Sequence, residues 1–202
     1  MHLVWDMDGT LLDSGVVVPA AYVAAVRQLD GRTITAADAV ARYWLGVPEL
    51  ILADLLGREI SAADADVYYD QLAKTEVAPY PDVPDVVADL HARGHPVAIF
   101  TGSSSRAAAI LLATAGLQAD VVIGGDLVER PKPAGDGLVV VASRLGVPAA
   151  DLAYVGDAPN DLRAARAVGA VAAAAAWGHQ YDPAEPADVT LAEPAGALAL
   201  LR

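Results

Sequence analysis

The sequence contains no cysteine, which excludes a disulfide framework and any zinc site built from cysteine thiolates. No apolar stretch approaches the ~20 residues that a membrane-spanning helix needs, because the longest, residues 167–177, has 11 residues and is mostly alanine. The chain also reaches Asp6 before any apolar region of signal-peptide length. We therefore expect neither secretion nor a membrane partner, and the absence of cysteine fits a cytoplasmic protein.

Basic residues are scarce, with 13 Lys and Arg against 26 Asp and Glu and a formal net charge of −13. This balance argues against nucleic acid or an anionic membrane surface as a partner, because both require a basic face. Hydrophobic residues make up 55% of the 202 residues, which is enough to bury a core. The length fits one domain, or one domain with a small insertion.

Strand and helix patterns alternate over residues 1–14 and 80–202. The expected strands are 3–8, 97–100, 121–123, 152–155 and 188–191, with helices between them and a last helix at 194–201. Residues 170–176 are almost all alanine, which favours a helix by propensity, but their place before Trp177-Gly178 favours a buried strand, as we predict. Such alternation predicts an α/β fold: a Rossmann-like parallel sheet with helices on both faces.

Residues 15–79 have no strand pattern and instead carry apolar residues at helical spacing. The expected helices are 19–29, 35–43, 48–56 and 61–76. We therefore predict two parts: a discontinuous α/β core formed by residues 1–14 and 80–202, and an all-helical insertion formed by residues 15–79.

Ligands bind beyond the carboxyl ends of the strands in open α/β sheets, so the residues after each predicted strand are candidate site residues. Asp6 and Asp8 end the first strand. Residues i and i+2 of an extended chain point the same way, about 6–7 Å apart. Two such carboxylates repel each other unless a cation or proton lies between them, and Mg²⁺ is a natural partner for their oxygens. The same acids could instead cap the turn before Gly9-Thr10.

Three further segments offer polar groups. Thr101 offers a hydroxyl, and Gly102 and Ser103 offer amides at a helix start, where anions bind; an ordinary serine N-cap is the alternative. Lys132, between two prolines, could neutralise phosphate oxygens or could be a solvated surface residue. In "GDAPND", residues 156–161, the two aspartates could bind a metal or could cap the following helix.

Together these motifs resemble those of the haloacid dehalogenase superfamily, on its phosphatase side and close to phosphoglycolate phosphatases. DxDGT is present at 6–10, the strand-ending threonine at 101, the lysine at 132 and GDxxxD at 156–161, in the family's order and across essentially the whole chain. The helical insertion resembles the family's small cap. The sequence departs from the family at Gly135-Asp136, where a Pro-Asp pair is common, and we expect a looser helix start there.

The resemblance implies that Asp6 is the nucleophile and forms an aspartyl-phosphate. Asp8 would protonate the leaving alcohol and then deprotonate water; the dehalogenases lack an acid there, so Asp8 favours phosphate esters. The expected cofactor is Mg²⁺, held by Asp6, Asp8 through its backbone carbonyl, Asp157 and Asp161. The expected phosphate-binding residues are Thr101, Gly102, Ser103 and Lys132.

The expected function is Mg²⁺-dependent hydrolysis of a small phosphorylated metabolite by a monomer or homodimer. Two alternatives stay open: a phosphosugar mutase, which the absence of a basic residue shortly after Gly46 weakens, and a non-catalytic binding protein, which would be expected to lose a motif residue. In the insertion, Arg42, Tyr43 and Trp44 are candidate substrate contacts, although they also fit a helix surface.

Overall fold

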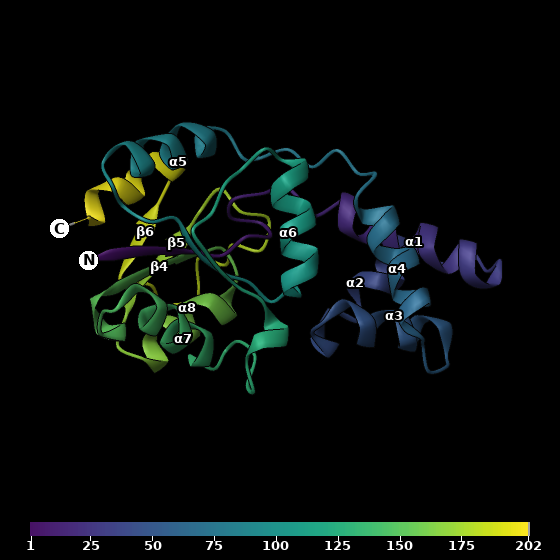
Figure 1. The fold of residues 1–202 in the computed structure, drawn as a ribbon. Helices are drawn as coiled ribbons and strands as arrows, with labels where there is room; N and C mark the ends of the chain where they lie inside the picture. Colours follow the sequence, from purple (N-terminus) through teal and green to yellow (C-terminus); the bar gives the residue numbers. More distant parts are fainter. Residues whose placement is uncertain (202) are drawn as a thin grey trace.

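The computed structural model describes residues 1–201 of the chain, and six parallel strands form one sheet in the order β3-β2-β1-β4-β5-β6 (Figure 1). The strands are β1 (His2–Trp5), β2 (Ala98–Phe100), β3 (Val121–Ile123), β4 (Leu152–Gly156), β5 (Val171–Ala175) and β6 (Val189–Leu191). The predicted α/β fold with a Rossmann-like parallel sheet is confirmed.

Both faces of this sheet are buried, as the apolar strands predict. Leu3 and Trp5 of β1 point into one apolar core, and Val4 between them points into the other. The alanine-rich segment is strand β5, and its residues divide between the two cores in the same way, Ala173 on one side and Ala172 on the other. Burial on two faces therefore overrides the helix propensity of alanine at this position.

Helices cover the sheet on both sides. Helices α5 (Val83–Ala92) and α6 (Ser105–Thr114) and the 3₁₀ helix η4 (Pro194–Leu200) pack on one face, and α7 (Asp136–Leu145) and α8 (Pro159–Ala167) pack on the other. Two short 3₁₀ turns, η2 (Gly125–Leu127) and η3 (Ala149–Asp151), connect the elements. The predicted C-terminal helix is therefore present, in the 3₁₀ form.

Between β1 and α5 the chain is helical. The elements are α1 (Val17–Asp30), α2 (Ala36–Val40), η1 (Tyr43–Leu45), α3 (Pro48–Leu56) and α4 (Ala62–Leu72). The helix expected over 35–43 stops at Val40, because Arg42 leaves the helical conformation at φ −109° and ψ 0°. The Arg42 guanidinium donates a hydrogen bond to the Asp38 carbonyl at 2.7 Å.

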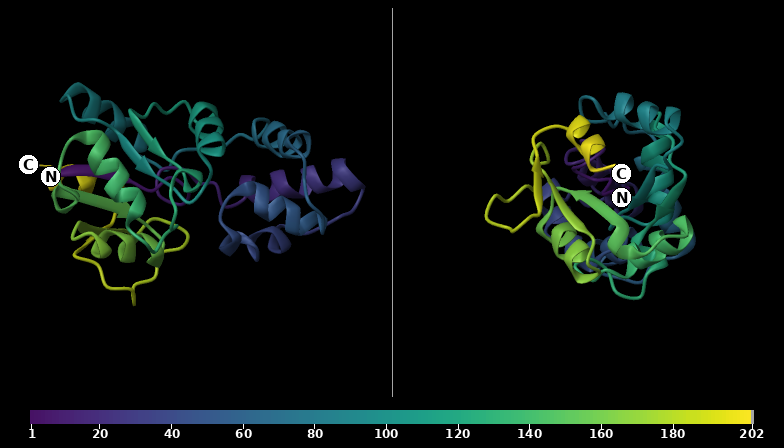
Figure 2. Two further views of the ribbon diagram at one scale, coloured as in Figure 1. Left: turned by 60° about the horizontal axis from the view of Figure 1, so that its bottom comes forward. Right: turned by 90° about the vertical axis from the view of Figure 1, so that its left-hand side faces the viewer.

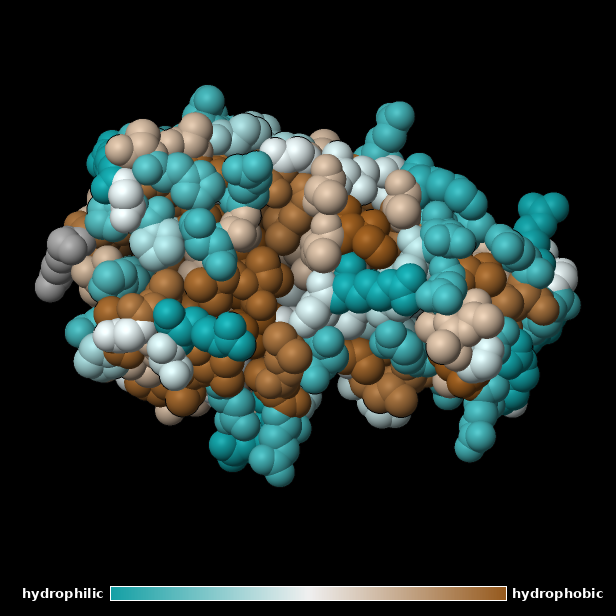
Figure 3. Space-filling view, viewed as in Figure 1, coloured by the Kyte–Doolittle hydropathy of each residue, from teal (hydrophilic) through white to brown (hydrophobic). Residues whose placement is uncertain are grey.

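The two connections to this helical insertion run side by side. Leu12 and Pro79 form an isolated antiparallel bridge, and the Tyr80 amide donates to the Leu11 carbonyl at 2.9 Å. The insertion lies beyond the carboxyl end of β1, whereas the N-terminus lies at the opposite end of the sheet (Figures 1 and 2). The surface is indented where the two parts meet (Figure 3). Among the described residues, no helix has the length and apolarity that a membrane crossing requires.

Candidate active site

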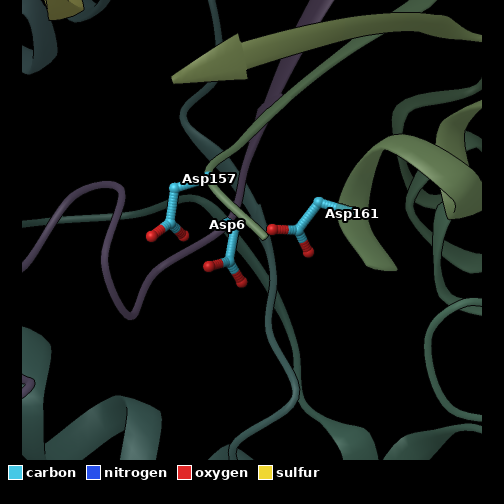
Figure 4. Close-up of side chains that lie close together, drawn as sticks. All are labelled: Asp6, Asp157 and Asp161. Atoms are coloured by element: carbon cyan, nitrogen blue, oxygen red, sulfur yellow. The ribbon is translucent and has the colours of Figure 1, made fainter. Parts of the chain in front are cut away.

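Three aspartates from two segments of the chain meet at the carboxyl end of the sheet. Asp6 follows β1, Asp157 follows β4 and Asp161 lies in the first turn of α8 (Figure 4). Each offers a carboxylate oxygen, and these oxygens lie within 4.8 Å of one another. All three side chains are buried. Because β1 and β4 are neighbours in the sheet, the first and fourth motifs are brought together as parallel pairing requires.

Glycines allow the main chain to approach these acids closely. A Cβ atom at Gly178 would lie 2.2 Å from the Cβ of Asp157, and one at Gly156 would lie 2.4 Å from the Cβ of Asp161. Gly9 combines a φ of +87° with only 2.5 Å between a hypothetical Cβ and Oδ2 of Asp157. A side chain at any of these positions would displace a carboxylate of the cluster.

Lys132 lies between two of the acids. Its Nζ donates to Oδ1 of Asp6 at 2.7 Å and to Oδ1 of Asp161 at 2.6 Å, with the lysine side chain only 13% exposed. Burial disfavours the ammonium charge, but the carboxylates of Asp161 and Asp6 outweigh burial and raise the pKa of Lys132 well above its usual value. The lysine is thus a fixed positive charge and not the solvated surface residue that the sequence left open.

The buried charges of the site do not balance. Three carboxylates face one ammonium group, which leaves two negative charges without a partner. Burial first, and then repulsion from Asp161 and Asp157, raises the pKa of Asp6 well above its usual value, although Lys132 opposes the shift. Burial likewise raises the pKa of Asp157. An oxygen-rich, buried cluster with two excess negative charges fits a hard divalent cation.

Asp8 points away from the acid cluster towards the loop after β2. Its Oδ1 accepts from the Ser14 hydroxyl at 2.6 Å, and its Oδ2 accepts from the Ser103 hydroxyl at 2.8 Å and the Thr101 hydroxyl at 3.4 Å. Gly102 is close to Lys132, whose Cε lies 3.8 Å from a hypothetical glycine Cβ. The structure therefore brings the predicted phosphate-binding loop and lysine to the same end of the sheet as Asp8 and Asp6.

Some residues of this site were not predicted from the sequence. The Tyr154 hydroxyl donates to the Phe100 carbonyl at 2.6 Å and lies 3.3 Å from both Lys132 Nζ and Asp161 Oδ1. Ser14 binds Asp8, as described above. Tyr154 lies inside an apolar strand, so the sequence pattern around it predicts only a core residue. Ser14 could have been found, because it follows the DxDGT motif by a few residues.

The three candidates in the insertion have different surroundings. The Arg42 guanidinium donates from Nε to Oδ2 of Asp54 at 2.6 Å and also donates to the Asp38 carbonyl. Trp44 is 80% exposed. Burial and then the negative charge of Asp8 raise the pKa of Tyr43, whose ring lies 6.5 Å from that of Tyr22 within the insertion.

A parallel α/β sheet with DxDGT and GDxxxD acids converging at its carboxyl end defines a class of hydrolase. Residues 1–169 match the model of the haloacid dehalogenase-like hydrolase family. The chain belongs to this family, and the resemblance noted in the sequence is confirmed. The expected enzyme class, a phosphatase of this superfamily, is confirmed with it.

Several known proteins match this chain over most of their own length. The phosphoglycolate phosphatase of Shigella dysenteriae is 31% identical over an alignment of 208 positions, gaps included. The alignment covers 89% of this chain and 82% of the relative. Probable phosphatase IndB of Dickeya dadantii is 31% identical and matches 96% of this chain and 92% of its own. The crystal structure of CbbY from Rhodobacter sphaeroides in complex with phosphate has a TM-score of 0.80 at 22% identity, covers 99% of this chain and 98% of its own, and is similar in fold.

Proposed function

We propose that the protein hydrolyses a small phosphorylated metabolite with the help of Mg²⁺, through an aspartyl-phosphate on Asp6. The observation that carries the proposal is the buried cluster of Asp6, Asp157 and Asp161 around the Lys132 ammonium, next to Asp8. The cluster provides a carboxylate nucleophile at a site whose charges favour a divalent cation, and the phosphatase relatives support phosphate esters as substrates.

In the first step an Asp6 oxygen forms a bond to phosphorus while the bond from phosphorus to the leaving oxygen breaks. Asp8, in its protonated form, gives its proton to that leaving oxygen. In the second step Asp8 takes a proton from water, and the water oxygen attacks phosphorus and releases the Asp6 carboxylate and inorganic phosphate. The hydroxyls of Ser14 and Ser103 hold the Asp8 carboxyl in place for both transfers.

The phosphate oxygens need positive partners as charge is redistributed. Lys132, whose Nζ donates to Oδ1 of Asp6 at 2.7 Å, would neutralise one of them. Thr101, Gly102 and Ser103 would bind the others through a hydroxyl and backbone amides. Asp6 and Asp157, with Asp161 and the Asp8 carbonyl, would hold Mg²⁺, which when bound offsets the negative charge of the nucleophile and of the phosphate.

We further propose that residues 15–79 act as a cap on a core formed by residues 1–14 and 80–202. Such a cap would exclude water and contact the leaving group. The bridge between Leu12 and Pro79 supports this role, because it brings the two ends of the insertion together beside the site. Tyr69 of the insertion also lies 2.8 Å from the Ser104 hydroxyl of the core.

Phosphate release tests the proposal. The protein would be incubated with a panel of phosphorylated metabolites in Mg²⁺ or in EDTA, with Asp6→Asn as the control. We expect release in Mg²⁺ that is lost in EDTA and in the variant. An isomerised sugar phosphate in place of free phosphate would indicate a mutase, and activity retained by Asp6→Asn would remove Asp6 as nucleophile.

A further inference from the structure

Helix α6 lies at the end of the core nearest the insertion, where it packs against α4 (Figure 1). Two side-chain contacts join these helices. The Tyr69 hydroxyl lies 2.8 Å from Oγ of Ser104, and Nη1 of Arg106 donates to Oδ1 of Asp66 at 2.6 Å. The Arg106 guanidinium also lies over the Tyr69 ring, 4.1 Å from its centroid. The insertion is therefore docked on the first turn of α6.

The contact at Tyr69 is buried and has a definite direction. Tyr69 is 2% exposed and Ser104 is 3% exposed. The Tyr69 hydroxyl donates its one proton to Oε1 of Glu49 at 2.5 Å, because a carboxylate can only accept. Ser104 must then donate to the Tyr69 oxygen, while its own oxygen accepts from the Ala107 amide at 3.2 Å. The result is a chain of hydrogen bonds that runs from the N-terminus of α6 through Ser104 and Tyr69 to a carboxylate of the insertion.

Ser104 is the N-cap of α6 and directly follows the loop that holds Asp8. The neighbouring Ser103 donates from its hydroxyl to Oδ2 of Asp8 at 2.8 Å, and the Ser103 amide donates to Oγ1 of Thr101 at 3.1 Å. A shift of Ser104 would also move Ser103, because a rigid peptide unit joins the two residues. The position of the Asp8 carboxyl therefore depends on how firmly Ser104 is held.

We propose that Tyr69 is a positioning residue for Asp8: its hydroxyl fixes Ser104 and, through Ser103, holds the Asp8 carboxyl where it protonates the leaving oxygen. This inference rests on the proposed phosphatase function. Without the Tyr69 oxygen, the buried Ser104 hydroxyl would lose its acceptor, and an unpaired buried donor is costly enough to shift towards a new partner. The docked insertion would thus complete the arrangement of the acid from outside the substrate site.

The leaving group of the substrate distinguishes this role from general damage. Methyl phosphate releases an alkoxide that needs a proton, whereas 4-nitrophenyl phosphate releases a phenolate that is stable without one. The ratio kcat/KM covers the reaction up to phosphoryl transfer, so it reports on Asp8 as an acid. In Mg²⁺, Tyr69→Phe should lower kcat/KM about tenfold for methyl phosphate and no more than about threefold for 4-nitrophenyl phosphate. The loss is partial because the Ser14 hydroxyl still binds Oδ1 of Asp8.

Other variants separate the hydrogen bond from the tyrosine itself. Tyr68→Phe is the matched control, because Tyr68 is a buried tyrosine of the same helix that stacks on Tyr22 inside the insertion. It should leave kcat/KM for both esters within about twofold of the wild type. Ser104→Ala should repeat the dependence on the leaving group, and Ser104→Thr, which keeps the hydroxyl, should restore it. Adding Tyr69→Phe to Ser104→Ala should cause no further loss, because both changes remove the same bond.

Hydrogen exchange gives a readout that needs no substrate. The Ala107 amide should exchange roughly fivefold faster in Tyr69→Phe than in the wild type, because its acceptor Ser104 is no longer fixed. The Tyr68→Phe control should exchange at the rate of the wild type.

Three results would overturn the inference. Equal losses with the two esters in Tyr69→Phe would show a general effect on folding or binding. Additive losses in the double variant would show that Tyr69 and Ser104 act separately, and unchanged exchange at Ala107 would show that Tyr69 does not hold the N-terminus of α6. If the wild type hydrolysed neither ester, the phosphatase proposal and the role in protonation would both be removed, while the exchange rates would still report on the hold of Tyr69 on α6.

Discussion

Lys132 places an ammonium group between two buried carboxylates, so its removal is expected to destabilise the metal-free protein strongly. The Asp6 and Asp161 side chains are 5% and 0% exposed, and each binds Nζ at 2.7 and 2.6 Å respectively. In Lys132→Met the two carboxylates would face each other without a positive charge between them. Breaking a buried ion pair by removing one member costs about 3–5 kcal/mol.

Urea unfolding in EDTA measures this loss. With a denaturant slope near 2 kcal/mol per molar, the midpoint of Lys132→Met should fall by roughly 2 M. Arg130→Met is the matched control, because it removes a positive charge two residues away whose side chain is 74% exposed and pairs with Asp136. Its midpoint should stay close to that of the wild type.

Mg²⁺ and pH should modulate the effect in defined directions. Added Mg²⁺ should raise the midpoint of Lys132→Met, because a divalent cation would neutralise the same carboxylates. The loss should shrink as the pH falls, since protonation of Asp6, whose pKa is raised, removes one of the unpaired charges. Equal midpoints for Lys132→Met and Arg130→Met would refute the reasoning that the lysine neutralises a buried cluster.

Three further predictions concern the same site. Gly178→Ala should weaken Mg²⁺ binding, because the new Cβ would lie 2.2 Å from the Cβ of Asp157. Titration calorimetry measures the affinity, and an unchanged value would mean that the backbone around residue 178 shifts to accommodate the methyl group. The raised pKa values of Asp6 and Asp157 mean that the folded state keeps protons that the unfolded state loses above about pH 4. The melting temperature in EDTA should therefore fall as the pH rises through these raised values, and Asp6→Asn should flatten the slope; a rise with pH would contradict this. Tyr69→Phe removes the 2.8 Å hydrogen bond between the insertion and Ser104 of the core, and proteolysis between the two parts should be faster, whereas an unchanged rate would show that this bond does not hold them together.

The sequence predicted the site best where its residues are placed by strand ends. Asp6 and Asp157 come together because β1 and β4 pair in parallel, a consequence of strand–helix alternation. The pairing of Lys132 with Asp161 depends on how the loop before α7 folds over the sheet, and no local pattern encodes that. Tyr154 was missed because a tyrosine in an apolar strand is usually a core residue, and only the structure shows its hydroxyl near the lysine.

The insertion was predicted less accurately than the core. Its helical character is clear from the spacing of apolar residues, but the break after Val40 depends on the Arg42 side chain reaching the Asp38 carbonyl and Asp54. Such side-chain interactions compete with helix continuation and have no periodic signature. The same interaction explains why Arg42, a reasonable candidate from its charge, is not offered to a substrate in this structure.

The central claim is that Asp6 carries the phosphoryl group, and trapping tests it most directly. The protein would be mixed with a rapidly hydrolysed phosphate ester and Mg²⁺, quenched in acid within milliseconds, reduced with borohydride and mapped by peptide mass spectrometry. Borohydride converts an aspartyl-phosphate to homoserine, and we predict homoserine at position 6 and none at position 8. Unmodified Asp6 in an enzyme that turns over under the same conditions, or modification at Asp8 instead, would contradict the account.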